Sequence, residues 1–116
     1  MTKSVTQAEQ EIAEDTLAFC MEHLQEHCTI QFLAERAGIS PTKLKTLFRR
    51  VYGTPLFAYI RAEKMHFAAR QLVLPNIRIF DIAEACGYDN ASKFSAAFRD
   101  VMGCSPKEYR ENVRSE

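Results

Sequence analysis

The sequence predicts an all-α protein of about seven helices with short links, in which one pattern of two helices occurs twice. Three observations favour this fold class. Alternation of apolar and polar residues, which would indicate strands, is nearly absent. Glycine and proline fall between the helical patterns, as expected of residues that end or begin helices. A short helix, a glycine and a longer capped helix also occur twice, about 50 residues apart.

The first expected helix runs from about Thr6 to His27 and is amphipathic, because its apolar residues recur at helical spacing. A second, short helix is expected over about 30–37. Gly38 follows it, and glycine readily takes the positive φ that ends a helix. The residues on or near the apolar face of the first helix are Ile12, Leu17, Cys20 and Leu24.

The remaining helices are bounded by residues that cap or break helices. Ser40-Pro41 begins the third, since serine accepts from free backbone N–H groups and proline suits the first helical position; this helix ends at about Tyr52, before Gly53. We expect subdomains over 1–54 and 76–116, with a linker helix over 55–75. The later helices, in chain order, are Pro55 to Leu74, Ile79 to Cys86, one capped by Asn90 that ends before Gly103, and one begun by Ser105-Pro106.

The composition indicates a folded chain with no membrane span. Of the 116 residues, 47% are hydrophobic, which is enough for a packed core. No apolar run approaches the ~20 residues of a membrane span, and no signal peptide opens the sequence. The four cysteines form no Cys-x-x-Cys pair, so we expect reduced thiols in a cytoplasmic protein. No pattern indicates a cofactor.

The net charge is zero, but the charges are unevenly distributed. Residues 1–35 contain one base and seven acids, whereas residues 36–70 contain eight bases and one acid. Residues 71–116 are nearly balanced, with six bases and seven acids. A local basic patch of this kind is typical of nucleic-acid binding, although a solvated basic face has the same composition.

The internal repeat predicts two helix-turn-helix units. Residues 33–39 resemble residues 82–88, and Ser40 matches Asn90 as the helix cap. In each copy a small residue allows close packing of two helices, a glycine permits the turn, and apolar residues anchor the second helix inward. The outward positions at the start of the second helix are then free to enter a major groove of DNA. Further matched pairs are Leu44 with Phe94, Phe48 with Phe98, Arg49 with Arg99, and Gly53 with Gly103.

These residues resemble the DNA-binding domain of the AraC/XylS family of bacterial transcription regulators over roughly residues 15–112. Within the family, residues 41–45 and 53–55 are similar to the PchR-like regulators of siderophore uptake. Tyr59-Ile60-Arg61 and Lys64-Met65 with Ala68 resemble the family's linker helix. The most specific stretch is Ile79-Phe80-Asp81-Ile82-Ala83-Glu84-Ala85-Cys86-Gly87-Tyr88, continuing through Phe94, Phe98, Gly103, Ser105-Pro106 and Tyr109-Arg110.

The resemblance implies a bilobed all-α fold, in which two helix-turn-helix subdomains are joined by the long linker helix. It also implies sequence-specific binding of double-stranded DNA, with two recognition helices in successive major grooves. A helix over 55–74 would span ~30 Å at the usual rise per residue. Successive major grooves on one face of DNA lie ~34 Å apart. A linker of this length therefore suits one chain that occupies two grooves.

By the geometry of the motif, the first recognition helix presents Thr42, Lys45 and Thr46 to base edges. Lys43, Arg49 and Arg50 are expected to meet phosphates. The matching residues of the second helix are short, so we expect less base recognition there. Arg61 and Arg99 are candidates either for phosphate binding or for structural ion pairs. The candidates on the second helix are Ala91, Ser92, Lys93, Ser95 and Ala96.

Two other classes of function are weighed against this interpretation. A helical protein-interaction module could bind RNA polymerase, or an effector or dimerisation domain that lies outside this chain. Cys20, His23 and His27 have a spacing that could bind zinc, but inward packing of Cys20 explains the pattern more simply. We expect no enzyme, because no nucleophile or phosphate loop is recognisable.

Overall fold

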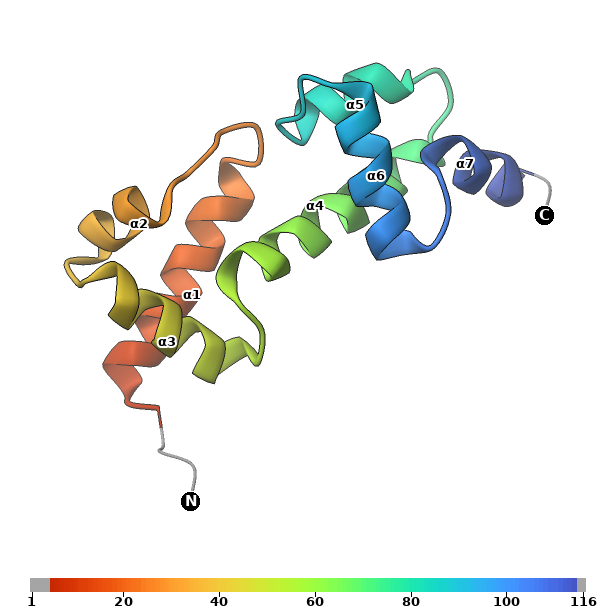
Figure 1. The fold of residues 1–116 in the computed structure, drawn as a ribbon. Helices are drawn as coiled ribbons and strands as arrows, with labels where there is room; N and C mark the ends of the chain where they lie inside the picture. The colour runs from red at the N-terminus through yellow and green to blue at the C-terminus, as the bar shows by residue number, and fades with distance from the viewer. Residues whose placement is uncertain (1–4, 115–116) are drawn as a thin grey trace. The chain divides into compact units, whose positions relative to one another are not determined.

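The computed structural model describes residues 5–114, and within that range every regular element is a helix. The expected fold class is confirmed (Figure 1). The helices are α1 (Gln7–Glu22), α2 (Ile30–Ala37), α3 (Pro41–Tyr52), α4 (Leu56–Leu72), α5 (Ile79–Ala85), α6 (Ala91–Met102) and α7 (Pro106–Arg114).

The chain divides into two compact units, and the division falls within α4. Unit 1 contains the chain up to His23 together with His27–Ile60. Unit 2 contains Leu24–Glu26 together with the chain from Arg61 onward. Each unit therefore contains one copy of the repeated helix pair, α2–α3 in unit 1 and α5–α6 in unit 2.

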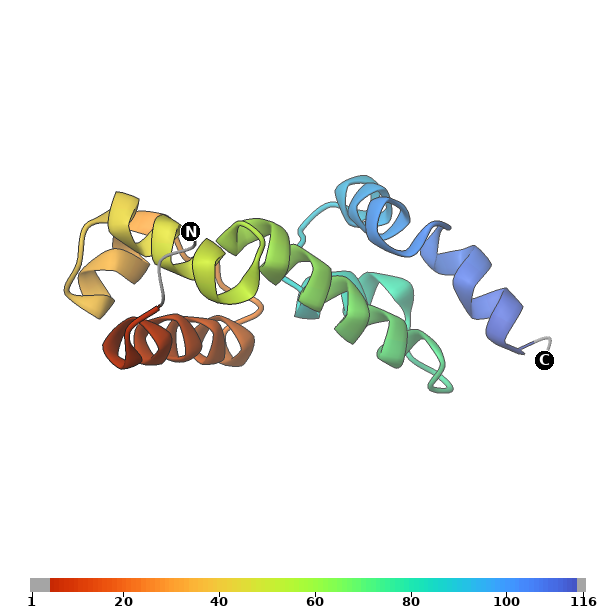
Figure 2. The same ribbon diagram turned by 90° about the horizontal axis from the view of Figure 1, so that it is seen from below.

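In unit 1, α1 and α3 pack side by side, and α2 packs against both (Figure 2). The inward residues of α3 recur at spacings of three and four, so they form one helical stripe. Tyr52 packs at a tilt and Tyr59 edge-on against the buried ring of Phe48. The fully buried side chains of this core include Leu33, Leu44, Leu47 and Phe48.

The core of unit 2 is built around two phenylalanines of α6. Phe94 and Phe98 of α6 are fully buried, and Tyr109 of α7 packs edge-on against Phe98. The Arg110 side chain donates from Nε to the Leu72 carbonyl oxygen at 2.9 Å and from Nη2 to the Ile77 carbonyl oxygen at 2.6 Å. The first bond satisfies a carbonyl group at the end of α4, where a helix leaves its last acceptors without partners, and the second fixes the segment between α4 and α5.

The helix limits follow the capping residues closely. The side-chain oxygens of Ser40 and Asn90 accept hydrogen bonds from the backbone N–H groups of Lys43 and Lys93. Gly53 and Gly103 end α3 and α6 in the left-handed conformation. The expected starts and ends of these two helices are confirmed.

The first helix is shorter than the sequence indicated, because α1 ends at Glu22 rather than near His27. His23 leaves the helical region, with φ −124° and ψ 43°. Its ring stacks on Phe19 at 4.0 Å between centroids, and its Nδ1 lies 2.7 Å from the Phe19 carbonyl oxygen. Leu24 therefore lies beyond the helix in a turn that belongs to unit 2, and the expectation that it shares the apolar face of α1 was wrong.

Two other expected limits differ slightly from the structure. α4 ends at Leu72 rather than Leu74, and α5 ends at Ala85 rather than Cys86. Cys86 is fully buried, with its thiol 3.5 Å from the Lys64 carbonyl oxygen. Burial raises the pKa of the Cys86 thiol to about 11. That residue therefore packs as a small apolar side chain at the turn.

Candidate nucleic-acid interface

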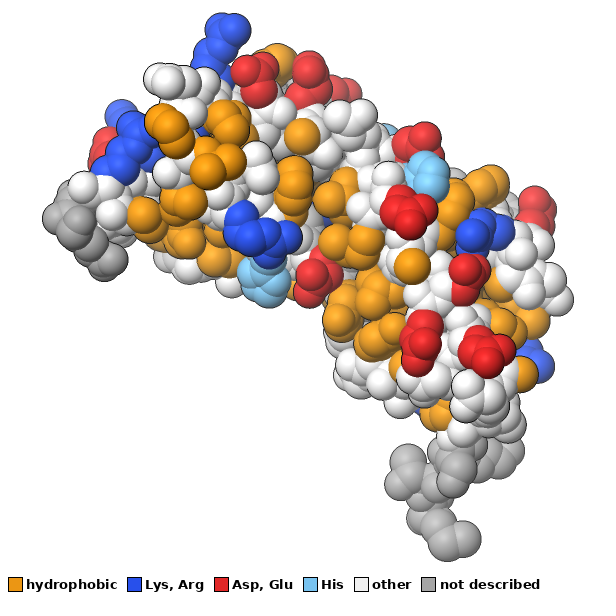
Figure 3. Space-filling view, turned by 180° about the vertical axis from the view of Figure 1, so that it is seen from behind, with side chains coloured by type: hydrophobic (Ala, Val, Ile, Leu, Met, Phe, Trp, Pro, Cys, Tyr) orange, Lys and Arg blue, Asp and Glu red, His pale blue; other side chains and the backbone are white. Residues whose placement is uncertain are grey.

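The outer face of α3 is polar and exposed because its apolar residues all point inward. Leu44, Leu47 and Phe48 are buried, and they leave the other side of the helix to solvent. α3 contains four bases and no acid, whereas α1 contains five acids and no base. On the face drawn in Figure 3, acidic side chains gather over the part of the chain that contains α1. The exposed residues of α3 include all six predicted contacts: Thr42, Lys43, Lys45, Thr46, Arg49 and Arg50.

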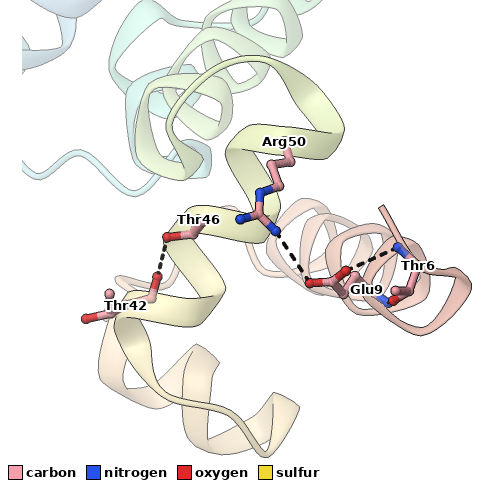
Figure 4. Close-up of polar contacts among 5 residues, drawn as sticks. All are labelled: Thr6, Glu9, Thr42, Thr46 and Arg50. Carbon is pink, nitrogen blue, oxygen red and sulfur yellow. Dashed lines mark hydrogen bonds and ion pairs between the residues drawn. The ribbon is translucent and has the colours of Figure 1, made fainter. Parts of the chain in front are cut away.

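Thr46 is partly committed to the helix itself. Its hydroxyl donates a hydrogen bond to the Thr42 carbonyl oxygen at 2.9 Å (Figure 4). In this arrangement the hydroxyl oxygen can still accept, and the methyl group remains available for apolar contact. Lys45 forms no ion pair with any residue of 5–114, so its amine is a long donor that is free to turn toward a base.

Arg50 points toward α1. Its Nη1 lies 3.9 Å from Oε2 of Glu9, while the Thr6 backbone N–H donates to Oε1 of the same carboxylate at 3.1 Å (Figure 4). The hydrogen bonds from Thr6, and then the charges of Arg50 and Lys43, lower the pKa of Glu9. A phosphate that binds Arg50 must therefore compete with this carboxylate.

The outer face of α6 is built in the same way but is less basic. Phe94, Ala97 and Phe98 are buried. Ser95 is half-buried, which further limits its reach. Asn90 is occupied as the cap, because its Oδ1 accepts from the Lys93 N–H at 3.0 Å. The exposed predicted residues of this helix are Ala91, Ser92, Lys93, Ala96 and Arg99.

Arg61 and Arg99, for which the sequence left two roles open, each form an ion pair within unit 2. Arg61 Nη2 lies 2.9 Å from Oδ2 of Asp100. Arg99 Nη2 lies 3.4 Å from Oε1 of Glu108, whose pKa is lowered by hydrogen bonds with Ser105 and then by Arg99. Both pairs are largely exposed, so each contributes little stability and can be exchanged for a phosphate contact.

A groove of about 300 Å³ adjoins the outer face of α3 within unit 1. Sequence reasoning missed Phe57, which is 46% exposed at this groove. A signal was available, because Leu56, Tyr59 and Ile60 form the inward stripe of α4 and Phe57 falls outside it. The groove is lined by Lys45, Thr46, Arg49, Pro55, Leu56 and Phe57.

Cys20 and His23, two of the residues considered for zinc, are packed within the fold. Over the part of the chain that the structure describes, no three His, Cys, Asp or Glu side chains gather so that they could hold a metal ion. The ring of His23 is stacked on Phe19, and Cys20 is buried.

Within residues 5–114, no helix is both long and apolar enough to cross a membrane.

Comparison with known proteins connects this architecture to transcription regulators. A helix-turn-helix domain model matches residues 33–112. The chain is 34% identical over 104 residues to the regulatory protein SoxS of Escherichia coli, covering 90% of this chain and 97% of SoxS. It is 30% identical over 105 residues to the transcriptional activator AarP of Providencia stuartii, covering 90% of this chain and 78% of AarP.

Two solved structures share the fold. The DNA-binding domain of the transcriptional factor AdpA, determined in complex with a target DNA, superposes with a TM-score of 0.82. It is 26% identical, and the match covers 89% of this chain and 93% of that domain. A regulator from Chromobacterium violaceum, described as having an AraC-type DNA-binding domain, has a TM-score of 0.80 at 23% identity; 91% of this chain and 95% of that one are covered.

Proposed function

Because the chain belongs to the AraC-type helix-turn-helix family of transcription regulators, we propose that α3 and α6 are its two recognition helices on duplex DNA. The protein is a sequence-specific DNA-binding regulator. The observation that carries the assignment is the matched pair of capped helices. Ser40 caps α3 and Asn90 caps α6. In both helices the exposed polar face begins at the same number of positions after the cap. Such a face at the start of the second helix is the part of the motif that meets base edges.

On α3, Lys45 is the principal base reader. Lysine donates to O6 and N7 of guanine, and threonine donates, accepts or packs its methyl group against thymine. Thr42 and Thr46 flank Lys45 in these roles. Lys43, Arg49 and Arg50 contact phosphates, which position the helix without carrying sequence information themselves.

On α6, phosphate docking and DNA shape account for more of the binding than base contacts. Ala91, Ser92, Ser95 and Ala96 have short side chains, and short side chains reach few base edges. Lys93 is the residue of this helix best able to find a guanine. Arg99, together with Arg61 from α4, contacts phosphates after exchanging its carboxylate partner.

These roles divide the chain into three parts. Residues 1–54 form the first binding subdomain, residues 55–75 the linker helix, and residues 76–116 the second subdomain. Each subdomain occupies a major groove, and the two grooves are successive. The role is one of binding, with no reaction catalysed, and PchR-like membership within the family stays a prediction.

Selection of bound sequences from random duplex DNA tests this function. We expect a defined consensus, stronger binding to duplex than to the corresponding single strands, and an affinity that falls with added salt as phosphate contacts release counterions. None of the proposed contact residues on α3 and α6 is aromatic, whereas single-strand binders stack bases on aromatic side chains. A helical protein-interaction module would give no consensus and no salt-sensitive duplex binding, and that outcome would overturn the proposal.

A further inference from the structure

The groove beside α3 combines an apolar floor with a basic wall. Leu56 is only 3% exposed and forms part of the floor, whereas Phe57 is 46% exposed. Lys45 and Arg49 line the α3 side of the groove. Neither forms an ion pair with another of the described residues. A half-exposed phenylalanine beside two available cations suits a ligand that is both apolar and anionic.

A second groove, in unit 2, also contains a half-exposed phenylalanine but has the opposite charge. It has a volume of about 400 Å³ and includes Phe80, which is 53% exposed. Its ionisable lining includes the carboxylates of Glu84 and Asp89. A polyanion would be repelled there. A comparison of variants in the two grooves therefore distinguishes the effect of an exposed phenylalanine on DNA affinity from the effect of the charges around it.

The groove of unit 1 is also continuous with the outer face of α3, which we propose contacts the bases. Lys45, Thr46 and Arg49 belong both to that face and to the lining of the groove. A helix in the major groove is bordered by the sugar-phosphate backbones of DNA. Each backbone alternates an anionic phosphate with a deoxyribose that presents C–H groups. This alternation of anionic and apolar groups matches a groove that is lined by cationic side chains and an aromatic ring.

We infer that this groove holds the sugar-phosphate edge of the bound duplex, with Phe57 packed against a deoxyribose and Arg49 on the adjoining phosphate. The inference rests on the proposed function, since it assumes that α3 lies in a major groove. It adds an apolar contact that depends on neither base sequence nor charge. Phe57 is then a DNA-contacting residue that the sequence motif does not include.

The Phe57→Ala variant tests the inference, with the duplex selected by the wild-type protein and a scrambled duplex of equal length as probes. Loss of about half of a buried phenylalanine contact predicts about five-fold weaker binding to both duplexes. The slope of affinity against salt should not change, because no charge is lost. Arg49→Ala should instead reduce that slope by about one phosphate contact.

Phe80→Ala is the matched control, since it removes a ring of similar exposure from the acidic groove. We expect it to bind both duplexes as the wild type does. Phe57→Leu should retain most of the affinity, and Phe57→Glu should lose more than Phe57→Ala by placing a carboxylate beside a phosphate. Thermal unfolding of each variant checks that the fold is intact; Phe57 is half-exposed, so little stability should be lost.

The outcomes separate this inference from the proposed function. Wild-type affinity in Phe57→Ala, with Lys45→Ala still altering base preference, would overturn the groove assignment and leave the function standing. An altered base preference in Phe57→Ala would also overturn it, because it would place the ring against a base. Absence of any sequence-specific binding by the wild-type protein would instead defeat the function itself.

Discussion

The recognition helices of the two units have nearly the same interior and very different exteriors. Both are capped by a short polar residue, both end at a left-handed glycine, and both bury an apolar residue four positions after the cap. Outward, α3 presents four bases and no acid, whereas α6 presents Lys93 and Arg99 together with Asp100. The inward residues and caps determine the fold, so the outward residues are free to differ in what they bind.

The basic side chains of the two units also differ in their distances to carboxylate partners within the protein. Arg50 is 3.9 Å from the carboxylate of Glu9, and Arg99 is 3.4 Å from that of Glu108. Both carboxylates belong to capping boxes, in which a helix N-terminus is closed by reciprocal hydrogen bonds. Asp100 occupies the position of α6 that matches Arg50 of α3. This carboxylate pairs with Arg61. Phosphate binding should therefore require more rearrangement in unit 2.

The largest difference that we expect between the units is in their turns. A Cβ at Gly87 would lie 2.9 Å from the Leu24 carbonyl oxygen, and Gly87 has a φ of +85°. Gly38 also has a positive φ but has open space where a Cβ would be. Gly87→Ala should therefore cost about 3 kcal/mol of unfolding free energy, and Gly38→Ala about 1 kcal/mol. Denaturant unfolding measures both, and equal losses would show that the close approach at Gly87 is relieved without cost.

The next effect concerns base recognition. Lys45→Ala should lower specific affinity by about 1–3 kcal/mol and relax base preference under α3. Ser95→Ala, at the matching position of α6, should change affinity by less than about 0.5 kcal/mol, because Ser95 is short and half-buried. Binding titrations with single-base variants of the selected duplex measure both effects. An unchanged preference in Lys45→Ala would remove Lys45 as a reader.

The same asymmetry should be visible in the sequences selected by the wild-type protein. They should contain one well-defined block under α3 and, about one helical turn away, a degenerate block under α6. Two blocks of equal information content, or a stronger second block, would contradict the proposed difference between α3 and α6.

A smaller effect is expected from the acid on α6. Asp100→Asn removes a carboxylate from the second recognition helix and releases Arg61 from its 2.9 Å ion pair. Affinity for any duplex should rise about two- to three-fold, and the salt slope should steepen by about one phosphate contact. Arg50→Gln, the change at the matching position of α3, should act in the opposite direction. Weaker binding by Asp100→Asn would show that the ion pair holds Arg61 in its binding position.

The smallest effect is the pH dependence of the two capping boxes. Hydrogen bonds with Thr6 and Ser105 lower the pKa values of Glu9 and Glu108 below the ordinary value of 4.5. The ionised carboxylates therefore stabilise the fold above that value, and the contribution is lost as the pH falls through the lowered pKa.

Measurement of thermal unfolding from neutral to acidic pH checks this contribution. Glu9→Gln and Glu108→Gln should each be slightly less stable than the wild type at neutral pH, and the difference should disappear in acid. Because Glu108 is exposed and Glu9 is only partly buried, the shifts should be small in both units. A difference that persists in acid would mean that the glutamates act through packing instead of charge.

The sequence predicted α3 and α6 well because their limits depend on local residues. A serine-proline pair, an asparagine cap and two glycines specify those limits within a few positions. The end of α1 was predicted poorly because the turn after it belongs to unit 2, where it packs against Gly87. A contact between residues about sixty positions apart has no signature in the periodicity of one helix.

The candidate contacts on α3 were predictable for the same reason, since helical periodicity alone places them outward. The partners of the arginines were not predictable. Arg61 meets Asp100 across 39 positions, and only the folded unit brings the two together. Helical periodicity places Phe57 outside the inward stripe of α4, but the groove that it lines forms only where α3 and the start of α4 meet in the folded unit.

The bonds of Arg110 bear on the order in which the units form as the chain is synthesised. They reach back 38 positions to Leu72 and 33 positions to Ile77. Unit 2 therefore lacks these bonds until α7 has been made, whereas all of unit 1 precedes Arg61. On a ribosome, the more basic recognition helix belongs to the half that can fold early, and the arginine of the last helix completes the other half.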